Sequence, residues 1–204
     1  MIIDLTLTLN QETPTYPDDP KLKIATTETF EAQGYLGHSV YMGTHAGTHI
    51  DAPAHMIKGG KTLERFSPEQ FVGAGRYVLV KDGLFNIEDV KAVGIQEGDI
   101  VIFNTGMSHK LLDEVYFTDY PAMDVEIAKY LVECKVKMVG VDTCSIDNKP
   151  GFPVHKILLG GNVLIIENLT NIEQLQGVKS IIYALPIKLD LDAAPARVIA
   201  EVRH

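Results

Sequence analysis

Short runs of apolar and β-branched residues recur along the chain, and only a few stretches repeat with a helical period. Short apolar runs bounded by turn formers are typical of β-strands. They predict strands at residues 2–7, 21–29, 77–81, 100–104, 136–141, 163–167, 181–189 and 198–202. The clearest helix is predicted at 124–135, where Asp124 can cap the first turn and apolar residues fall near one face. A second helix is predicted at about 86–93.

This mixture of strands and short helices predicts an α/β fold with a mixed sheet. The opening third has strands but lacks the helices that a regular βαβ winding requires, which argues against a Rossmann fold. A length of 204 residues favours one domain, spanning 1–204. The Pro-rich stretch at 14–20 is interpreted as an ordered loop rather than a linker.

Charge and composition exclude several partners. The net charge is −9, and the 18 basic residues are scattered, so neither nucleic acid nor an anionic membrane surface is an expected partner. Apolar runs such as residues 163–166 are too short to span a bilayer. No secretory signal is recognised at the first residues, so we expect a cytoplasmic protein. Cys134 and Cys144 are expected to be free thiols.

The strongest chemical signal is the segment HAGTHIDAPAH, which places His45, His49, Asp51 and His55 within eleven residues. The glycine and the proline inside it oppose a helix. In an extended chain all four side chains have the same parity and can leave from one side. A straight strand would separate His45 from His49 by about 13 Å, too far for shared ligation, so we predict a bend near Gly47.

Histidine and aspartate together favour zinc, manganese or another borderline divalent ion. A polar surface loop that merely contains several histidines is the alternative. Further ligands are expected from His155, which begins a short helical piece, and from Glu167, which closes an apolar strand. A glutamate at such a strand end could equally emerge into solvent.

Three motifs together resemble the cyclase family of metal hydrolases, which includes bacterial kynurenine formamidase and isatin hydrolase. They are HAGTHIDAPAH, the stretch GVDTCSID at 140–147, and the block at 155–167 with Asn168 and Leu169 after it. The similarity extends through nearly the whole chain, to the closing PARV at 195–198. The resemblance implies a swivelling β/β/α-type domain, usually paired as a homodimer, with one or two zinc or manganese ions.

Carried over by position, the resemblance implies that His45, His49 and Asp51 hold a first ion. Asp51, His155 and Glu167 would hold a second, and Glu167 could bridge the two. These assignments predict a centre built from the first motif and from the end of a distant strand.

The resemblance also implies that His55 is the general acid and base. Tyr16 occupies the place where a Trp of the formamidases lies against the substrate. The expected reaction is hydrolysis of an amide bond in a small aromatic substrate, first an aryl formamide such as N-formylkynurenine. A cyclic amide such as isatin, a dehydration or ring closure at the same metal, and a non-catalytic metal-binding module are the alternatives.

The remaining reactive residues have weaker cases. His38 could line the pocket, but a hydrogen-bonded structural role is favoured. His109 follows a turn at a strand end and is as readily a surface residue. His204 is terminal and expected to be solvated. Cys144 lacks a matched base nearby, so a buried inert thiol is favoured over a nucleophile.

Overall fold

The central element of the structure, a computed structural model that describes residues 1–203, is a mixed sheet that closes on itself. Its eight strands within these residues are, in spatial order, β1 (Ile2–Asp4), β10 (Ala193–Arg203), β4 (His49–Asp51), β8 (Leu164–Glu167), β7 (Met138–Val141), β6 (Ile100–Asn104), β5 (Val72–Leu79) and β9 (Lys179–Pro186). Because β9 also pairs with β10, the strands from β10 round to β9 form a barrel, and β1 extends the sheet beside β10. His204 lies outside the described residues.

The four strands from β5 to β8 are parallel neighbours, and the other pairings in the barrel are antiparallel. Ile100 and Ile102 of β6 belong to one core cluster, whereas Val101 and Phe103 belong to a second cluster. Parallel strands that are buried on both faces have continuous apolar sequences. This confirms the predicted mixed α/β fold; the closure into a barrel was not predicted.

Three helices cover the outer face of the parallel strands: α2 (Ile87–Ala92), α4 (Val125–Glu133) and α5 (Pro153–Gly160). Both helices predicted from the sequence are present, slightly shorter than expected. The shorter helices are α1 (Phe30–Gln33) and α3 (Val115–Thr118), with 3₁₀ turns η1 (Pro53–His55), η2 (Leu63–Arg65), η3 (Pro68–Phe71), η4 (Met107–Lys110) and η5 (Ile172–Leu175). Among residues 1–203, no helix combines the length and apolar character that a bilayer crossing requires.

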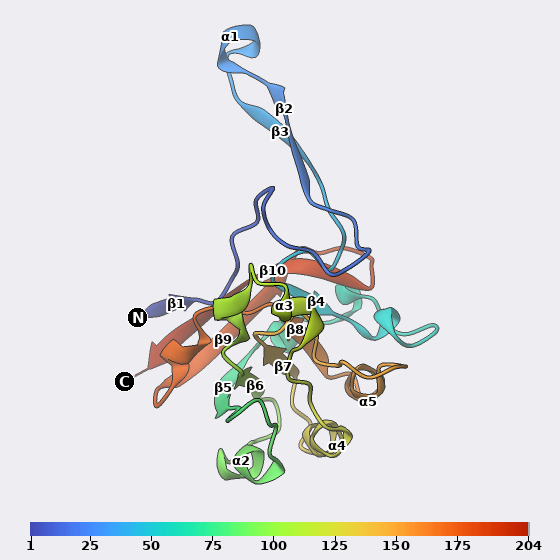
Figure 1. The fold of residues 1–204 in the computed structure, drawn as a ribbon, viewed down its shortest axis with the longest axis vertical. Helices are drawn as coiled ribbons and strands as arrows, with labels where there is room; N and C mark the ends of the chain where they lie inside the picture. Colours follow the sequence, from blue (N-terminus) through green and yellow to red (C-terminus); the bar gives the residue numbers. More distant parts are fainter. Residues whose placement is uncertain (204) are drawn as a thin grey trace.

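A separate two-stranded hairpin of β2 (Lys23–Glu28) and β3 (Gly37–Tyr41), with α1 at its tip, projects away from the barrel (Figure 1). No residue of α1 is buried, and most of both strands is exposed. The exposed side chains include five large apolar residues: Phe30, Tyr35, Leu36, Val40 and Tyr41. The hairpin therefore has no core of its own.

Several strand boundaries differ from the sequence prediction. The strand expected at 77–81 begins at Val72. Gly73 and Gly75 are poor strand formers, so the sequence pattern did not indicate this start. In the structure they allow close packing of neighbouring segments. A Cβ atom on Gly75 would lie 2.5 Å from Ser180 Oγ of β9. The strand expected at 2–7 ends at Asp4. The stretch around His38, which is strand-like in the sequence, forms β3, whereas β4 was not predicted.

Candidate metal centre

The HAGTHIDAPAH segment bends before it enters the barrel. Gly47 has φ +60°, a conformation that favours glycine, and the turn around it brings His45 beside the strand β4. This confirms the predicted bend. His49 and Asp51 lie on β4 with the same parity, and His49 is directly opposite Glu167 of β8 in the antiparallel register. Strand pairing therefore joins the first motif to Glu167 across more than a hundred residues of sequence.

The first group of donors surrounds Asp51. His45 Nδ1 lies 2.9 Å from Asp51 Oδ1, and His49 Nε2 lies 3.3 Å from the same oxygen. His49 Nε2 is also 3.5 Å from Glu167 Oε2. Donors bound tetrahedrally at about 2 Å from one zinc ion would lie about 3.3 Å apart. The spacing of these side chains therefore fits a shared divalent cation.

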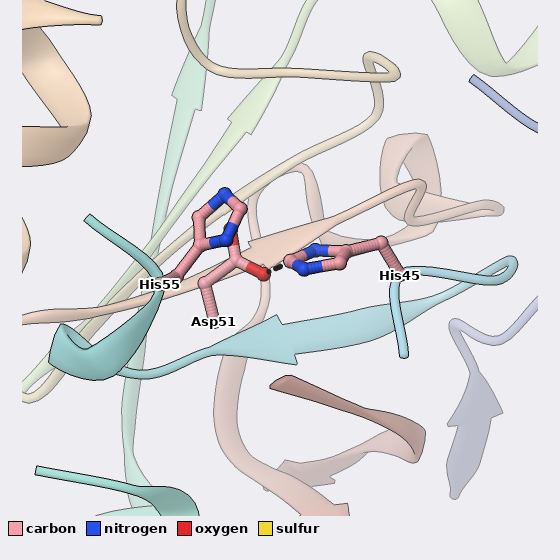
Figure 2. A group of neighbouring side chains, drawn as sticks. All are labelled: His45, Asp51 and His55. Atoms are coloured by element: carbon pink, nitrogen blue, oxygen red, sulfur yellow. Dashed lines mark ion pairs between the residues drawn. The ribbon is translucent and has the colours of Figure 1, made fainter. Parts of the chain in front are cut away.

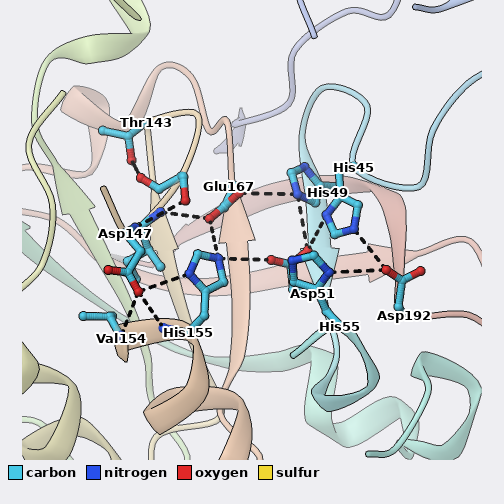
Figure 3. Close-up of polar contacts among 12 residues, drawn as sticks. His45, His49, Asp51, His55, Thr143, Asp147, Val154, His155, Glu167 and Asp192 are labelled. Carbon is cyan, nitrogen blue, oxygen red and sulfur yellow. Dashed lines mark hydrogen bonds and ion pairs between the residues drawn. The ribbon is translucent and has the colours of Figure 1, made fainter. Parts of the chain in front are cut away.

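His155 approaches the same carboxylates from the first turns of α5 (Figure 3). Its Nε2 lies 3.2 Å from Glu167 Oε1 and 3.7 Å from Asp51 Oδ2. Its backbone N–H and that of Val154 both donate to Asp147 Oδ2, which holds the start of the helix. The structure thus brings together all six residues that the sequence singled out for metal binding and catalysis, although their individual roles stay predictions.

Several buried polar atoms at this centre make no hydrogen bond within residues 1–203: His49 Nε2, both carboxylate oxygens of Asp51, and His155 Nδ1. Leaving such atoms unsatisfied is costly, because burial removes the water that would otherwise solvate them. A cation bound between them would satisfy the Asp51 oxygens and His49 Nε2 together. The donor chemistry and the burial therefore fit a divalent metal.

The protonation behaviour of the centre indicates an excess of negative charge. Burial alone would raise the pKa of Asp51, but the imidazoles of His49 and His45 hold that pKa well below its usual range. Burial alone would lower the pKa of His45, but Asp51 and Asp192 raise it to about 9. In the same way Asp147 and Glu167 raise the pKa of His155 to about 10. The site attracts positive charge, whether as protons or as a metal.

A buried chain of hydrogen bonds fixes the ring of His49. Its Nδ1 lies 2.8 Å from the carbonyl oxygen of Gly47, which also accepts from Asn168 Nδ2 at 3.1 Å. Tyr116 in turn donates its hydroxyl to Asn168 Oδ1 at 2.7 Å. With Nδ1 donating its proton to a carbonyl, Nε2 is left with its lone pair toward Asp51. Asn168 and Tyr116 were not predicted to support the site.

His55 lies at the end of the 3₁₀ turn η1, with its ring centroid 4.3 Å from that of His45 (Figure 2). Burial, together with the positive charges of His45 and His155, lowers its pKa, so the ring is neutral at neutral pH. One ring nitrogen each of His45 and His55 and one carboxylate oxygen of Asp51 lie within 4.8 Å of one another. His55 could therefore act either as a base or as a further ligand.

Asp192 is a fourth carboxylate beside the site that sequence reasoning missed. It lies in the loop before β10, and its Oδ2 contacts His45 Nε2 at 3.1 Å and His55 Nδ1 at 3.4 Å. In the sequence it falls between the strands predicted at 181–189 and 198–202, where no local pattern distinguishes it from a surface aspartate.

Most of the donors line one cavity of about 210 Å³, and these are His45, His49, His55, His155 and Glu167. Aromatic side chains from three distant segments also line it, and these are Tyr16, Phe117 and Phe152. Tyr16 and Phe117 meet edge to face with ring centroids 6.4 Å apart. The prediction placed Tyr16 against a substrate, and its side chain does line the cavity.

The weaker histidine candidates lie away from the centre, whereas the cysteine candidate lies beside it. His38 is exposed on the hairpin and His109 is exposed on η4, and neither lines the cavity. Cys144 lines the cavity, but its thiol donates to the carbonyl oxygen of Tyr116 and burial raises its pKa to about 12. A thiol that stays protonated is a poor nucleophile, which agrees with the expectation from the sequence.

Comparison with known proteins points to one family. The model of the Cyclase family, described as "Putative cyclase", matches residues 3–148. An uncharacterized protein of Methanocaldococcus jannaschii is 33% identical over 208 residues, covering 98% of each chain. Kynurenine formamidase of Bacillus cytotoxicus is 28% identical and covers 97% of this chain and 95% of the relative.

Solved structures give the same picture. A structure described as a potential metal-dependent hydrolase with cyclase activity is 31% identical, with a TM-score of 0.81, over 100% of this chain and 98% of that one. Isatin hydrolase A from Ralstonia solanacearum is 26% identical, with a TM-score of 0.86, over 98% of this chain and 91% of that one. The similarity in both cases extends over the whole barrel and its helices.

Proposed function

Since the chain belongs to the Cyclase family, we propose that it is a metal-dependent hydrolase that cleaves an amide bond next to an aromatic group. The observation that carries the proposal is the convergence of histidine and carboxylate donors, several of them buried without a hydrogen-bond partner in the described residues, beside an aromatic cavity. Relatives named kynurenine formamidase and isatin hydrolase support the proposed reaction class.

We propose zinc as the metal, with manganese as the alternative. His45, His49 and Asp51 would hold one ion, and Asp51, His155 and Glu167 would hold a second where two are bound. A bound divalent ion supplies Lewis acidity, which makes water a stronger acid and polarises a carbonyl oxygen. The other steps, substrate binding and proton transfer, would depend on the protein's own side chains.

His55 is proposed as the group that moves the proton. Its lowered pKa leaves a neutral imidazole, which can take a proton from the attacking water. The same ring can then return that proton to the leaving nitrogen, which must be protonated before the amide bond breaks. The ring lines the cavity in which the substrate would bind, and this supports the proposed role.

The aromatic side chains favour a flat substrate. Tyr16, Phe117 and Phe152 can pack against an aryl ring while its amide group faces the metal donors. An aryl formamide of the N-formylkynurenine type is the first substrate proposed. The volume of the cavity suits a small aromatic amide.

A second candidate substrate follows from the charges in the cavity. Among residues 1–203, the cavity lining contains neither Lys nor Arg, while Asp19 lies at the lining and is exposed. An amino-acid substrate would need a cation for its carboxylate. A neutral cyclic amide of the isatin type has no such requirement and fits the small cavity.

The test begins with protein stripped of metal and resupplied with zinc or manganese. Release of formate from N-formylkynurenine, or opening of isatin, only in the presence of metal would support the proposal. Labelled water identifies the chemistry, because hydrolysis places the labelled oxygen in the new carboxylate, whereas a dehydration does not. Turnover of neither substrate with either metal would contradict the amide hydrolase assignment.

The protein is further proposed to act as a homodimer. A two-stranded hairpin is marginally stable alone in water, and this one exposes five large apolar side chains. Packing against a second copy of the chain would cover them. The cytoplasmic location expected from the sequence stays a prediction.

A further inference from the structure

We propose that Asp192 is a positioning residue that orients two imidazoles of the centre, His45 and His55. The orientation of His45 concerns metal binding, and the orientation of His55 rests on the proposed role of that residue as a base. Asp192 lies in the loop that leads into β10, far in sequence from both histidines. Its side chain is half-buried beside both rings (Figure 3).

A single carboxylate oxygen contacts both rings. Asp192 Oδ2 lies 3.1 Å from His45 Nε2 and 3.4 Å from His55 Nδ1. The other oxygen, Oδ1, accepts from the hydroxyl of Thr44 at 3.4 Å, which steadies the carboxylate from the opposite side. The two rings are tilted by 46° with centroids 4.3 Å apart, so neither can turn freely while both contacts hold.

The backbone holds Asp192 firmly in this place. Its carbonyl oxygen accepts from the N–H of Ala52 at 2.8 Å, at the junction between β4 and η1. The next residue, Ala193, lies opposite Asp51 in the pairing of β10 with β4. The carboxylate is therefore fixed relative to both the strand that carries Asp51 and the turn that carries His55.

The chemical consequence follows from the two nitrogens of an imidazole. When His45 donates Nε2–H to Asp192, its Nδ1 keeps a lone pair, and this nitrogen faces Asp51 at 2.9 Å. When His55 donates Nδ1–H, its Nε2 keeps the lone pair needed by a base. Histidines that bind metals usually donate the other ring N–H to such an acceptor, and loss of the acceptor weakens metal affinity about 10- to 100-fold.

The experiment compares Asp192→Asn and Asp192→Ala with Asp190→Asn. Asp190 lies in the same loop and accepts from the hydroxyl of Thr62 at 3.0 Å, so it is a matched control for the loop. Zinc affinity is measured by competition with a chelator. We expect it to fall about 10- to 100-fold in Asp192→Ala, less in Asp192→Asn, and not at all in Asp190→Asn.

Two further readouts separate positioning from a merely structural role. We expect kcat to fall in Asp192→Ala while KM is unchanged, because the substrate still meets the same cavity wall. Nitrogen NMR of the zinc-loaded protein should show His55 with its proton on Nδ1, and both tautomers in Asp192→Ala. Asp192→Asn has nearly the same size and serves if the alanine variant does not fold.

Unchanged zinc affinity together with an unchanged His55 tautomer in Asp192→Ala would overturn the proposal. Both measurements are independent of turnover. If the wild-type protein hydrolyses neither N-formylkynurenine nor isatin, the proposed function fails, and the zinc affinity still decides the role of Asp192.

Discussion

Asp51 is the residue on which the centre depends. Its Oδ1 faces His45 and His49, and its Oδ2 faces His155, so a single carboxylate meets donors from three segments of the chain. Both oxygens are buried and make no hydrogen bond within the described residues. Protonation does not relieve this, because the neighbouring imidazoles hold its pKa well below the usual range. A buried carboxylate that stays ionised needs positive charge beside it, which protonated imidazoles or a metal ion can supply.

Replacing His55 with alanine tests whether this residue is the base or a metal ligand. We expect His55→Ala to keep its metal and to lose about 10²- to 10⁴-fold in kcat, the usual contribution of a positioned acid or base. The measurements are metal content and steady-state kinetics. His109→Ala, which removes an exposed histidine away from the cavity, should behave like the wild-type protein. Loss of metal from His55→Ala would make His55 a ligand instead.

The raised pKa of His45 predicts how the metal-free protein responds to pH. Folded protein holds the His45 proton up to a pKa of about 9, whereas an unfolded chain loses it near 6.5. The stabilisation is therefore complete below pH 6.5 and is lost as pH rises through 9.

Thermal unfolding of the metal-free protein between pH 6.5 and pH 9.5 measures this loss. A loss of about 1 kcal/mol would lower Tm by about 2–4 °C in a protein of this size. His45→Gln should show a smaller decline over the same range. A Tm that is constant in the wild-type protein would show that His45 is not held protonated.

At the scale of elements, the turn between His45 and β4 sets the geometry of the centre. Gly47 has φ +60°, and a Cβ atom there would lie 2.4 Å from Leu9 Cδ2. Gly47→Ala therefore strains the backbone and displaces the end of the Leu9 side chain, and we expect weaker zinc binding and a loss of stability of about 2 kcal/mol. Chelator competition and chemical denaturation measure the two effects.

Gly94→Ala is the control for backbone strain alone. Gly94 has φ +67°, but an added Cβ would meet nothing within 4 Å. Its cost should be limited to about 1–2 kcal/mol, with no change in zinc affinity. Equal losses of stability in the two variants, with zinc affinity intact in both, would show that the turn at Gly47 does not position the ligands.

The same turn shows why part of the centre could be predicted from the sequence. His45, His49 and Asp51 are close in sequence. Their side chains leave from the same side of an extended chain, and one bend at a glycine is enough to bring them together. Glu167 and His155 could be proposed because of their local positions, but their distance from Asp51 depends on strand pairing that no local pattern contains. Asp192 was missed for the same reason, since only the pairing of β10 with β4 brings it to the histidines.

The barrel itself was only partly predictable. Its parallel strands are buried on both faces and have continuous apolar sequences, so β6 was predicted with its observed bounds. β4 has three residues, two of them polar, and its sequence resembles a loop. The closing pair of β9 and β10 joins strands that could also have ended an open sheet.

At the scale of the whole molecule, the hairpin is the feature that a single chain does not explain. It holds two strands together without a buried side, and it projects away from the barrel (Figure 1). Burial of its exposed apolar side chains against a second chain would contribute about 25 cal/mol for each Å² removed from water. Symmetric pairing of two chains would let each hairpin be covered, which is the basis of the proposed homodimer.

Light scattering on the purified protein tests this pairing. We expect a mass near twice 22.5 kDa for the wild-type chain. Replacing Tyr35 and Leu36 together with serine removes two exposed apolar side chains from the hairpin and should shift the mass toward the monomer at low concentration. Leu112→Ser is the matched control, because Leu112 is 83% exposed and lies outside the hairpin. A wild-type mass of one chain at all concentrations would leave the hairpin without a second copy, and an equal shift in Leu112→Ser would mean that general surface polarity, not the hairpin, governs association.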